Sequence, residues 1–386
     1  MIKPTYYLKK LLKELIGIPI YFLTFLVPKN KHLWVFGEWL GYRYADNSKY
    51  LFEYVNLNHP EIVAIWLSKD NTIVDEVRSK GFKAYKSYSL KGSLLSMRAK
   101  VHVVTHDGSD TNTYFCGGSK LMMLTHGTPL KHQGVDLQAN RMGFFTTFVD
   151  RYGPYIFPLK RKYDLVFCAD ELAQTRFQSA FPTAKEVLPF GYPRWDAYYS
   201  KEQNKKLNEI VERYDLVISF MPTLRFYNEI QYDPFSVEGF NEFSNFLVEN
   251  NYLLLVRPHP VMRLKNENIE NENIKFVGSN EFPNVFDIFN KTDILITDYS
   301  SVMFDFKITG RKIILLTPDL DFYLNEDVGV YGDFSEDAIG EVVKNWDEVI
   351  SILRRKEDII PIKYDFIEGD SSKKIIKYIK KSIRFN

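Results

Sequence analysis

The sequence predicts an α/β protein with two doubly wound domains, and three observations support this prediction. The chain has 386 residues, which is long for one hydrophobic core, and 45% of them are apolar, which is enough for two cores. Short apolar runs alternate with segments of helical spacing, the pattern of a parallel sheet covered by helices. The alternation pauses at a charged stretch, 201–213, and then restarts. We therefore expect two Rossmann-like domains that face a central cleft.

Charge and cysteine usage narrow the range of functions. The 50 basic and 49 acidic side chains give a net charge of +1, which creates no overall field toward nucleic acid or a membrane. Cys116 and Cys168 lie in or beside apolar runs without metal-like spacing, as expected of buried thiols in a reducing compartment. We expect no nucleic-acid partner, and any membrane affinity must come from local patches.

The N-terminal segment, 1–29, is predicted to associate with a membrane. Four lysines precede the apolar run 15–27, in which Gly17 and Pro19 are interruptions. No small-residue cleavage site of a signal peptide follows, and the run is short for a membrane-spanning helix. An interfacial anchor with lysines near anionic headgroups fits this pattern. The alternative is a helix that covers the protein core.

The remaining elements are predicted in chain order. The first Rossmann-like domain, 30–200, has apolar runs that predict strands at 33–36, 63–67, 101–105, 121–125, 165–168 and 187–190, and helical spacing at 47–56 and 72–80. The stretch 201–213 is predicted to be a linker with some helix. The second domain, 214–386, has strand-like runs at 216–220, 253–256, 274–277, 294–297 and 313–316.

The segment 140–162 interrupts the alternation, because it places aromatic residues among the basic side chains of Arg141, Arg151, Lys160, Arg161 and Lys162. Aromatic and basic residues together suit the headgroup region of a membrane. Stacking on single-stranded nucleic acid would use the same residue types. The chain has no wider basic surface, so we favour a membrane-facing role.

Polar clusters follow the predicted strands at the points where they end. Open α/β sheets bind ligands just beyond the carboxyl ends of their strands. Arginine forks, a lysine charge and hydroxyl groups at this edge predict a site for a doubly charged phosphate group. The candidate residues are His126, Thr128, Pro129, Lys131, Thr223, Arg225, Arg257, His259, Asp298, Ser300 and Ser301.

The stretch 294–306 (ILITDYSSVMFDF) is the focus of this prediction. A buried strand runs into Asp298, after which Ser300 or Ser301 can cap a helix and leave backbone N–H groups pointing outward. Hydroxyls, backbone donors and the positive end of a helix dipole at one point suit a phosphate. An ordinary, well-capped strand-to-helix junction remains the alternative.

Two histidines are candidates for chemistry. Gly127 and Pro129 force a turn that displays His126, which is either a catalytic base or an ordinary surface histidine. His259 lies between two prolines that make its loop rigid, which suits contact with a diphosphate. His102 and His106 share a strand face by parity, but no third ligand has metal-like spacing. We therefore predict neither a metal site nor a cofactor.

As an ordered set, the motifs resemble the CDP-glycerol glycerophosphotransferase family of teichoic acid synthesis. The motifs are HGTPLK at 126–131, GYPR at 191–194, PTLR at 222–225, RPHP at 257–260, DYSS at 298–301 and PDLD at 318–321. The stretch 41–50 is similar to the family's shorter, primase-type members. The resemblance covers essentially the whole chain from about residue 33. One departure is Val328-Gly329, where the family usually has an Arg-Gly pair.

The resemblance implies a GT-B fold and a peripheral enzyme on the cytoplasmic face of the cell membrane. It implies that 30–200 serves the acceptor and that 214–386 binds the CDP-activated donor. It makes His126 the base, gives His259 a catalytic role and assigns donor binding to Ser300 and Ser301. The long polymerases of the family carry an extra N-terminal region that this sequence lacks, which favours a primase or a short-chain transferase.

The expected reaction is transfer of glycerol phosphate from CDP-glycerol to a hydroxyl of an undecaprenyl-diphosphate-linked acceptor, with release of CMP. Arg225, Arg257 and His259, together with the two serines, would stabilise charge on the diphosphate oxygens. CDP-ribitol is an alternative donor. A sugar-nucleotide glycosyltransferase of capsule synthesis would use the same fold, and a non-catalytic membrane scaffold would bind the nucleotide without reacting.

Overall fold

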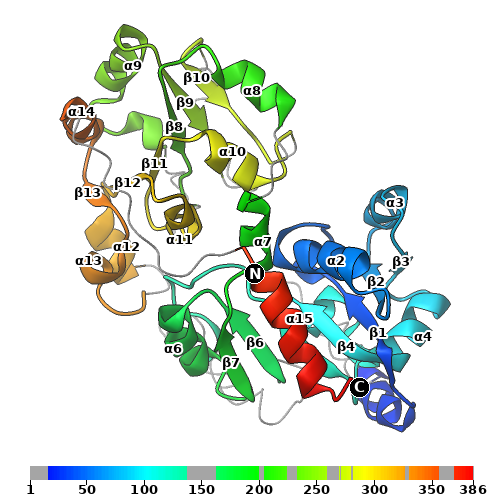
Figure 1. Ribbon diagram of the computed structural model, residues 1–386. Coiled ribbons are helices and arrows are strands. Elements are labelled where there is room, and N and C mark those ends of the chain that lie inside the picture. The colour runs from blue at the N-terminus through cyan, green and yellow to red at the C-terminus, as the bar shows by residue number, and fades with distance from the viewer. Residues whose placement is uncertain are drawn as a thin grey trace. The chain divides into compact units, whose positions relative to one another are not determined.

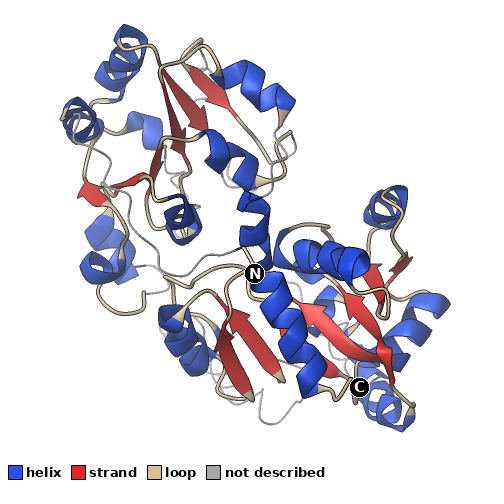
Figure 2. Ribbon diagram, viewed as in Figure 1, coloured by secondary structure: helices blue, strands red, loops and turns tan. Residues whose placement is uncertain are grey.

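The computed structural model describes residues 16–136, 162–199, 204–223, 233–258, 269, 271–279, 281–326, 330–355 and 369–385. Contacts between residues divide the chain into two units (Figures 1 and 2). The first contains Met1–His126, Gln133–Asp196 and Asp370–Asn386, and the second contains Gly127–His132 and Ala197–Gly369. The chain therefore passes from one unit to the other directly after His126.

The first unit contains a parallel sheet of seven strands in the order β3-β2-β1-β4-β5-β6-β7. Its central strands are continuous apolar runs because helices cover both faces of such a sheet. The core contains Trp34, Phe36, Phe52 and Trp66, all without solvent exposure. The strands are β1 (Asn30–Phe36), β2 (Val63–Ser68), β3 (Ala84–Lys86), β4 (Ala99–Val104), β5 (Lys120–Met123), β6 (Leu165–Cys168) and β7 (Glu186–Pro189).

Three helices of the first unit, α3, α4 and α6, begin at side-chain caps that the sequence provides. The carboxylates of Asp70 and Asp170 and the hydroxyl of Ser89 each accept a hydrogen bond from a backbone N–H of the first helical turn. The helices are α2 (Asp46–Asn58), α3 (Asn71–Ser79), α4 (Leu90–Arg98), α6 (Glu171–Ala180), α7 (Pro193–Asp196) and α15 (Ser371–Ser382).

The second unit contains a parallel sheet of six strands in the order β10-β9-β8-β11-β12-β13. Trp346 lies in its core, stacks on Phe243 at 4.6 Å between ring centroids, and donates its indole N–H to the Pro234 carbonyl at 3.0 Å. The strands are β8 (Leu216–Phe220), β9 (Tyr252–Val256), β10 (Ile274–Phe276), β11 (Ile294–Thr297), β12 (Lys312–Leu316) and β13 (Glu341–Val343). The helices are α8 (Lys205–Val211), α9 (Phe240–Glu249), α10 (Val285–Lys291), α11 (Val302–Phe306), α12 (Leu320–Glu326), α13 (Phe334–Asp337) and α14 (Trp346–Arg354).

The structure confirms an α/β protein with two parallel sheets, and each predicted strand is present with bounds that differ by a few residues at most. The strands β3 and β13 were not predicted, because each is very short and lacks a continuous apolar run. Part of the predicted linker is helix α8. The facing of two domains across a cleft, as in a GT-B fold, stays a prediction.

The C-terminal helix differs from the expected domain boundaries, which assigned 214–386 to one domain. Ile375, Ile376 and Ile379 of α15 pack into the core of the first unit. The helix begins where the Asp196 carboxylate accepts hydrogen bonds from the backbone N–H groups of Ser371, at 3.1 Å, and Ser372, at 2.9 Å. The apolar stripe of this helix shows that it must be buried, but its sequence does not specify on which sheet.

The described part of the N-terminal segment is helical at 16–23 and continues as a short turn, Thr24–Leu26. Thr24 is buried and Gly17 lies against the Tyr114 ring, so one side packs on the first unit. Other side chains are exposed, including Leu23 at 61% and Leu26 at 80%. The packing matches the alternative of a helix that covers the core, and association with a membrane stays a prediction. Among the described residues, no helix is long and apolar enough to cross a membrane.

Candidate functional site

His126 lies just beyond the carboxyl end of β5, where the chain turns sharply. Thr125 has a left-handed backbone conformation with a φ of 47°. Gly127 has a φ of 147°, a value that residues with a side chain rarely adopt. The Thr125 hydroxyl donates to the Phe167 carbonyl at 3.1 Å, and the Asn47 amide donates to the Thr125 carbonyl at 2.8 Å. These bonds from neighbouring elements hold the turn that carries His126, whose ring is packed against His106 and not displayed as the sequence predicted.

Arg194 holds the backbone of His126 in place. Its Nη1 donates to the His126 carbonyl at 3.0 Å and to the Asp46 carboxylate at 2.7 Å. The Arg194 backbone N–H donates to the Asn47 side chain at 3.1 Å. Arg194 is only 8% exposed, so this ion pair is shielded from water. The start of α2 and the start of α7 are thereby joined at the end of β5.

The environment of the His126 imidazole favours its neutral form. Its ring stacks on the ring of His106 with centroids 4.6 Å apart and planes 11° apart. Burial, and then the nearby His106, lower the pKa of His126 to about 4. Its Nδ1 is buried and has no hydrogen-bond partner among the described residues. A neutral imidazole with an unsatisfied nitrogen suits the uptake of a proton from a bound hydroxyl.

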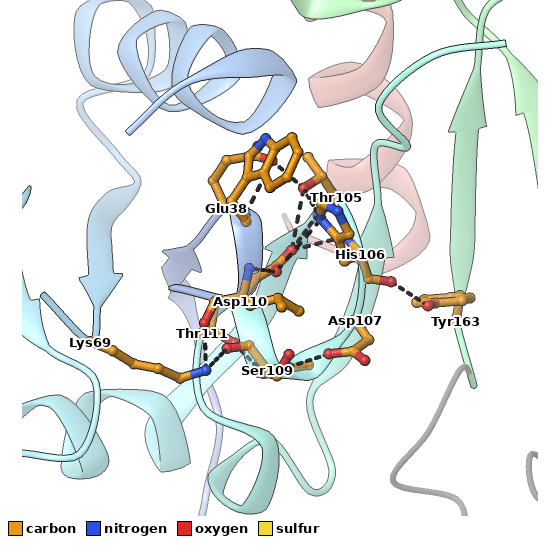
Figure 3. Close-up of polar contacts among 12 residues, drawn as sticks. Glu38, Lys69, Thr105, His106, Asp107, Ser109, Asp110, Thr111 and Tyr163 are labelled. Carbon is orange, nitrogen blue, oxygen red and sulfur yellow. Dashed lines mark hydrogen bonds and ion pairs between the residues drawn. The ribbon is translucent and has the colours of Figure 1, made fainter. Parts of the chain in front are cut away.

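A buried polar network supports His106 (Figure 3). The Asp110 carboxylate accepts from the backbone N–H groups of Thr105, at 2.8 Å, and His106, at 2.9 Å. The Thr105 hydroxyl lies 3.0 Å from Nδ1 of His106 and also bonds Glu38. Tyr163 donates its hydroxyl to the His106 carbonyl. Burial raises the pKa of both Glu38 and Asp110 above that of an exposed carboxyl group.

Backbone strain is concentrated around this network. Trp39, Leu40 and Asp46 have positive φ values of 46°, 57° and 53°, as Thr125 does. Such conformations cost about 1 kcal/mol or more for residues with a side chain and persist only where the surroundings enforce them. The Leu40 N–H, for example, donates to Asp110 at 2.6 Å. Clustered strain of this kind is typical of functional sites.

In the second unit, Asp298 organises the loop after β11. Its carboxylate accepts from the Thr223 backbone N–H, at 2.9 and 3.0 Å to its two oxygens, and from the Tyr299 N–H at 2.7 Å. Asp298 is 1% exposed. The carboxylate thus bonds its own loop and the backbone that follows β8.

The two serines differ in role at the start of α11. The Ser300 hydroxyl accepts from the Val302 N–H at 3.3 Å and caps the helix. Ser301 has helical angles and makes no side-chain cap bond. Helix α11 has only five residues, so its dipole is small. A phosphate at this helix start would therefore depend on the serine hydroxyls more than on the dipole that the sequence predicted.

One guanidinium nitrogen of Arg257 stabilises a loop of the second unit. Its Nη1 donates to the carbonyls of Val277, at 3.2 Å, and Phe282, at 2.6 Å. Burial lowers the pKa of Arg257 to about 10. The predicted phosphate fork is therefore also an anchor for the loop after β10.

The loop directly after His126 belongs to the second unit. Tyr331 donates its N–H to the Leu130 carbonyl at 2.9 Å, and Thr128 is buried with a hydroxyl that has no partner among the described residues. Nζ of Lys131 lies 4.9 Å from the centroid of the Tyr323 ring.

Tyr323 connects Lys131 with the loop after β11. Its ring stacks on that of Tyr299 with centroids 3.6 Å apart, and the Tyr299 hydroxyl donates to Asp319 at 2.9 Å. The second unit thereby brings together the DYSS motif, the PDLD motif and the part of HGTPLK that follows His126. Pro129 lies in the same loop as Lys131 and is buried.

The candidate residues Arg225 and His259 lie outside the described residues, as do 140–161 and the Val328-Gly329 pair. Four residues with roles at this site were not predicted from the sequence, namely Asp46, Asn47, His106 and Arg194. Asp46, Asn47 and Arg194 lie in motifs that carried the family resemblance, and these motifs could have pointed to them. For His106 the sequence offered only its position on the same strand face as His102. Among the described residues, no group of three or more His, Cys, Asp or Glu side chains is placed to hold a metal ion.

Comparisons with known proteins agree on one family. A family model described as CDP-Glycerol:Poly(glycerophosphate) glycerophosphotransferase matches residues 19–378. The chain is 29% identical over 390 residues to a teichoic acid poly(glycerol phosphate) polymerase of Bacillus spizizenii, covering 93% of this chain and 96% of that protein. It is 29% identical over 370 residues to a teichoic acid glycerol-phosphate transferase of Staphylococcus aureus, covering 91% of each.

A solved structure of a variant of the wall teichoic acid polymerase TagF with CDPG is also similar. Its TM-score is 0.73 at 25% identity, covering 100% of this chain and 99% of that one. Because the family model spans most of the sequence, the chain belongs to the CDP-glycerol:poly(glycerophosphate) glycerophosphotransferase family.

Proposed function

We propose that this protein transfers glycerol phosphate from CDP-glycerol to a hydroxyl group of a lipid-linked acceptor and releases CMP. The observation that carries the proposal is the neutral, stacked imidazole of His126 at the end of β5, in a chain of this family. The acceptor oxygen attacks the β-phosphorus, the bond from that phosphorus to the bridging oxygen breaks, and CMP leaves. His126 takes the hydroxyl proton.

The donor diphosphate is bound by residues of the second unit. The unsatisfied hydroxyl of Thr128 and the hydroxyls of Ser300 and Ser301 can donate to phosphate oxygens, and Lys131 adds positive charge. Thr223 lies beside the loop after β11, because its backbone N–H donates to the Asp298 carboxylate of that loop. Arg225, Arg257 and His259 complete the proposed set. Preorganised donors of this kind stabilise the charge that spreads over the transferred phosphoryl group.

The acceptor is proposed to be an undecaprenyl-diphosphate-linked saccharide at the cytoplasmic face of the membrane. The exposed apolar side chains of Phe22, Leu23, Phe25 and Leu26 support attachment to a lipid surface. They lie on the described end of the predicted membrane-associating segment, 1–29. Attachment would bring the enzyme to an acceptor that cannot leave the bilayer.

A donor panel tests the proposal. The purified protein is incubated with a lipid-linked saccharide acceptor and, separately, with CDP-glycerol, CDP-ribitol and UDP-sugars, and the released nucleotide is measured. We expect CMP from CDP-glycerol and none with an inactive His126→Ala control. CMP from CDP-ribitol alone would assign the ribitol donor. UDP release would identify a glycosyltransferase, and donor binding without nucleotide release would identify a scaffold.

A further inference from the structure

A pocket of about 390 Å³ lies in the first unit at the amino ends of β5, β6 and β7. Lys120 begins β5, Asp164 directly precedes β6 and Lys185 directly precedes β7. Because the strands are parallel, this edge of the sheet is opposite to the carboxyl ends where His126 lies. Its volume is within the range of small-molecule sites. The proposed reaction does not use it.

One wall of the pocket is basic. The Nζ atoms of Lys120 and Lys185 both contact Oδ1 of Asp164, at 2.8 and 2.6 Å. Lys162 also lines the pocket and is exposed. Three lysines and one aspartate therefore line the pocket, so basic side chains outnumber acidic ones in its lining. Lysine ammonium groups supply point charges for a phosphate oxygen.

The aromatic part of the lining comes from the N-terminal helix and turn. Tyr21, Phe22 and Phe25 line the pocket. Phe22 and Phe25 are also 55% and 53% exposed, and together with the exposed Leu23 and Leu26 they form an apolar ridge. Phe22 and Phe25 therefore belong both to the pocket lining and to this ridge. A free phosphate would be attracted by the lysines but would gain nothing from the apolar side chains.

We propose that this pocket binds the headgroup of an anionic phospholipid while the apolar ridge contacts the acyl region of the same bilayer. The inference rests on the proposed membrane attachment and adds to it a lipid class and a binding site. The lysine charges match the lipid phosphate, and the aromatic residues suit the boundary between headgroups and acyl chains. Lys162 is the last residue of the predicted membrane-facing segment 140–162, which places that segment's end at the same pocket.

The test measures binding of the full chain to vesicles of phosphatidylcholine alone and to vesicles that also contain phosphatidylglycerol. The variant Lys162→Gln with Lys185→Gln removes two charges and leaves Lys120 paired with Asp164, which protects the fold. The matched control is Lys373→Gln with Lys377→Gln, because these lysines are exposed on α15 and do not line the pocket.

We expect the parent to bind phosphatidylglycerol vesicles more tightly than neutral ones. The pocket variant should lose about tenfold or more of its affinity for the anionic vesicles and bind neutral vesicles like the parent. The control pair should lose little. Inorganic phosphate should not release the parent from the vesicles.

The proposal can be overturned at each arm of this experiment. Equal losses in the two lysine pairs would mean general electrostatic attraction, and an unchanged pocket variant would mean that the headgroup binds elsewhere. Release by inorganic phosphate would make the pocket a site for free phosphate. Equal binding of the parent to both vesicle types would leave membrane attachment intact but remove the headgroup site. If the parent binds neither vesicle, the proposed attachment itself fails.

Discussion

The imidazole of His106 lies nearly parallel to that of His126, with the ring centroids 4.6 Å apart. Two imidazoles at this separation cannot both carry a positive charge without repulsion. The contact therefore helps burial to keep His126 neutral, which is the state that a base requires. His106 is a positioning residue in this arrangement, since it acts through His126.

Replacing His106 by Phe should change the pH profile of the enzyme. The phenyl ring can keep the stack, but the change removes a group that helps to lower the pKa of His126 from the ordinary 6.5 to about 4. The pKa of His126 should then rise, so the acid limb of kcat/KM should move to higher pH. Activity between about pH 5 and 6 should fall more than activity at about pH 8. Equal loss at every pH would mean that His106 is only structural.

Replacing His126 by Ala should abolish turnover and leave CDP-glycerol binding nearly intact. Loss of a positioned base typically costs about 10²–10⁴-fold in rate. The backbone carbonyl that Arg194 holds is still present in this variant, so the turn should keep its shape. Turnover and calorimetric donor binding are measured side by side. A rate within about threefold of the parent would exclude His126 as the base.

Replacing Arg194 by Ala should destabilise the first unit strongly. It leaves the carboxylate of Asp46 without its shielded partner, and breaking a buried pair in this way costs about 3–5 kcal/mol. Changing Arg194 to Met together with Asp46 to Asn removes both charges and should recover part of the loss. Urea unfolding of the single and double variants measures the difference. A loss below about 1 kcal/mol for Arg194→Ala would show that the pair behaves as an exposed one.

The serines after β11 should separate stability from donor binding. Ser301→Ala should weaken CDP-glycerol binding by roughly 1.5–3 kcal/mol without a stability loss, because Ser301 makes no cap bond. Ser300→Ala should also cost about 1 kcal/mol of stability, because its hydroxyl caps α11.

Arg257→Ala provides the comparison for these variants. It should lower the free energy of unfolding, since two carbonyls lose their donor, and donor affinity should fall at least as much as in Ser301→Ala. Calorimetry and urea unfolding are applied to all three proteins. If Ser301→Ala and Arg257→Ala both bind the donor like the parent, the phosphate lies elsewhere.

His102 should make the protein less stable in acid. Its ring nitrogens lie 3.0 Å from the Thr111 hydroxyl and 3.1 Å from the Ser96 carbonyl, and burial lowers its pKa to about 3. Below pH 6.5 the unfolded chain gains a proton that the folded chain does not accept until about pH 3. The free energy of unfolding should therefore fall as pH decreases through this window, by up to about 1.4 kcal/mol per pH unit. His102→Gln should flatten the dependence in urea titrations, and an unchanged slope would contradict this assignment.

Local patterns in the sequence were sufficient for every strand of the two parallel sheets except β3 and β13. Apolar runs such as 294–297 and 216–220 are strands in the structure because burial on both faces of a sheet requires a continuous apolar run. The position of His126 beyond a strand end was predictable for the same reason, since the strand and the Gly127 turn are both local features. The motif resemblance also indicated the family that the comparisons identify.

Only the tertiary structure decided which side chains meet. Arg194 and Asp46 form their ion pair across 148 residues of sequence, and no local periodicity encodes such a contact. Arg257 was expected to bind phosphate, yet its Nη1 donates to backbone carbonyls of the loop after β10. The reason is that a buried guanidinium needs hydrogen-bond partners for its N–H groups. Helix α15 gives a third example, because its apolar stripe shows only that one face is buried. The packing of Ile375 and Ile379 in the core of the first unit depends on the tertiary path of the whole chain.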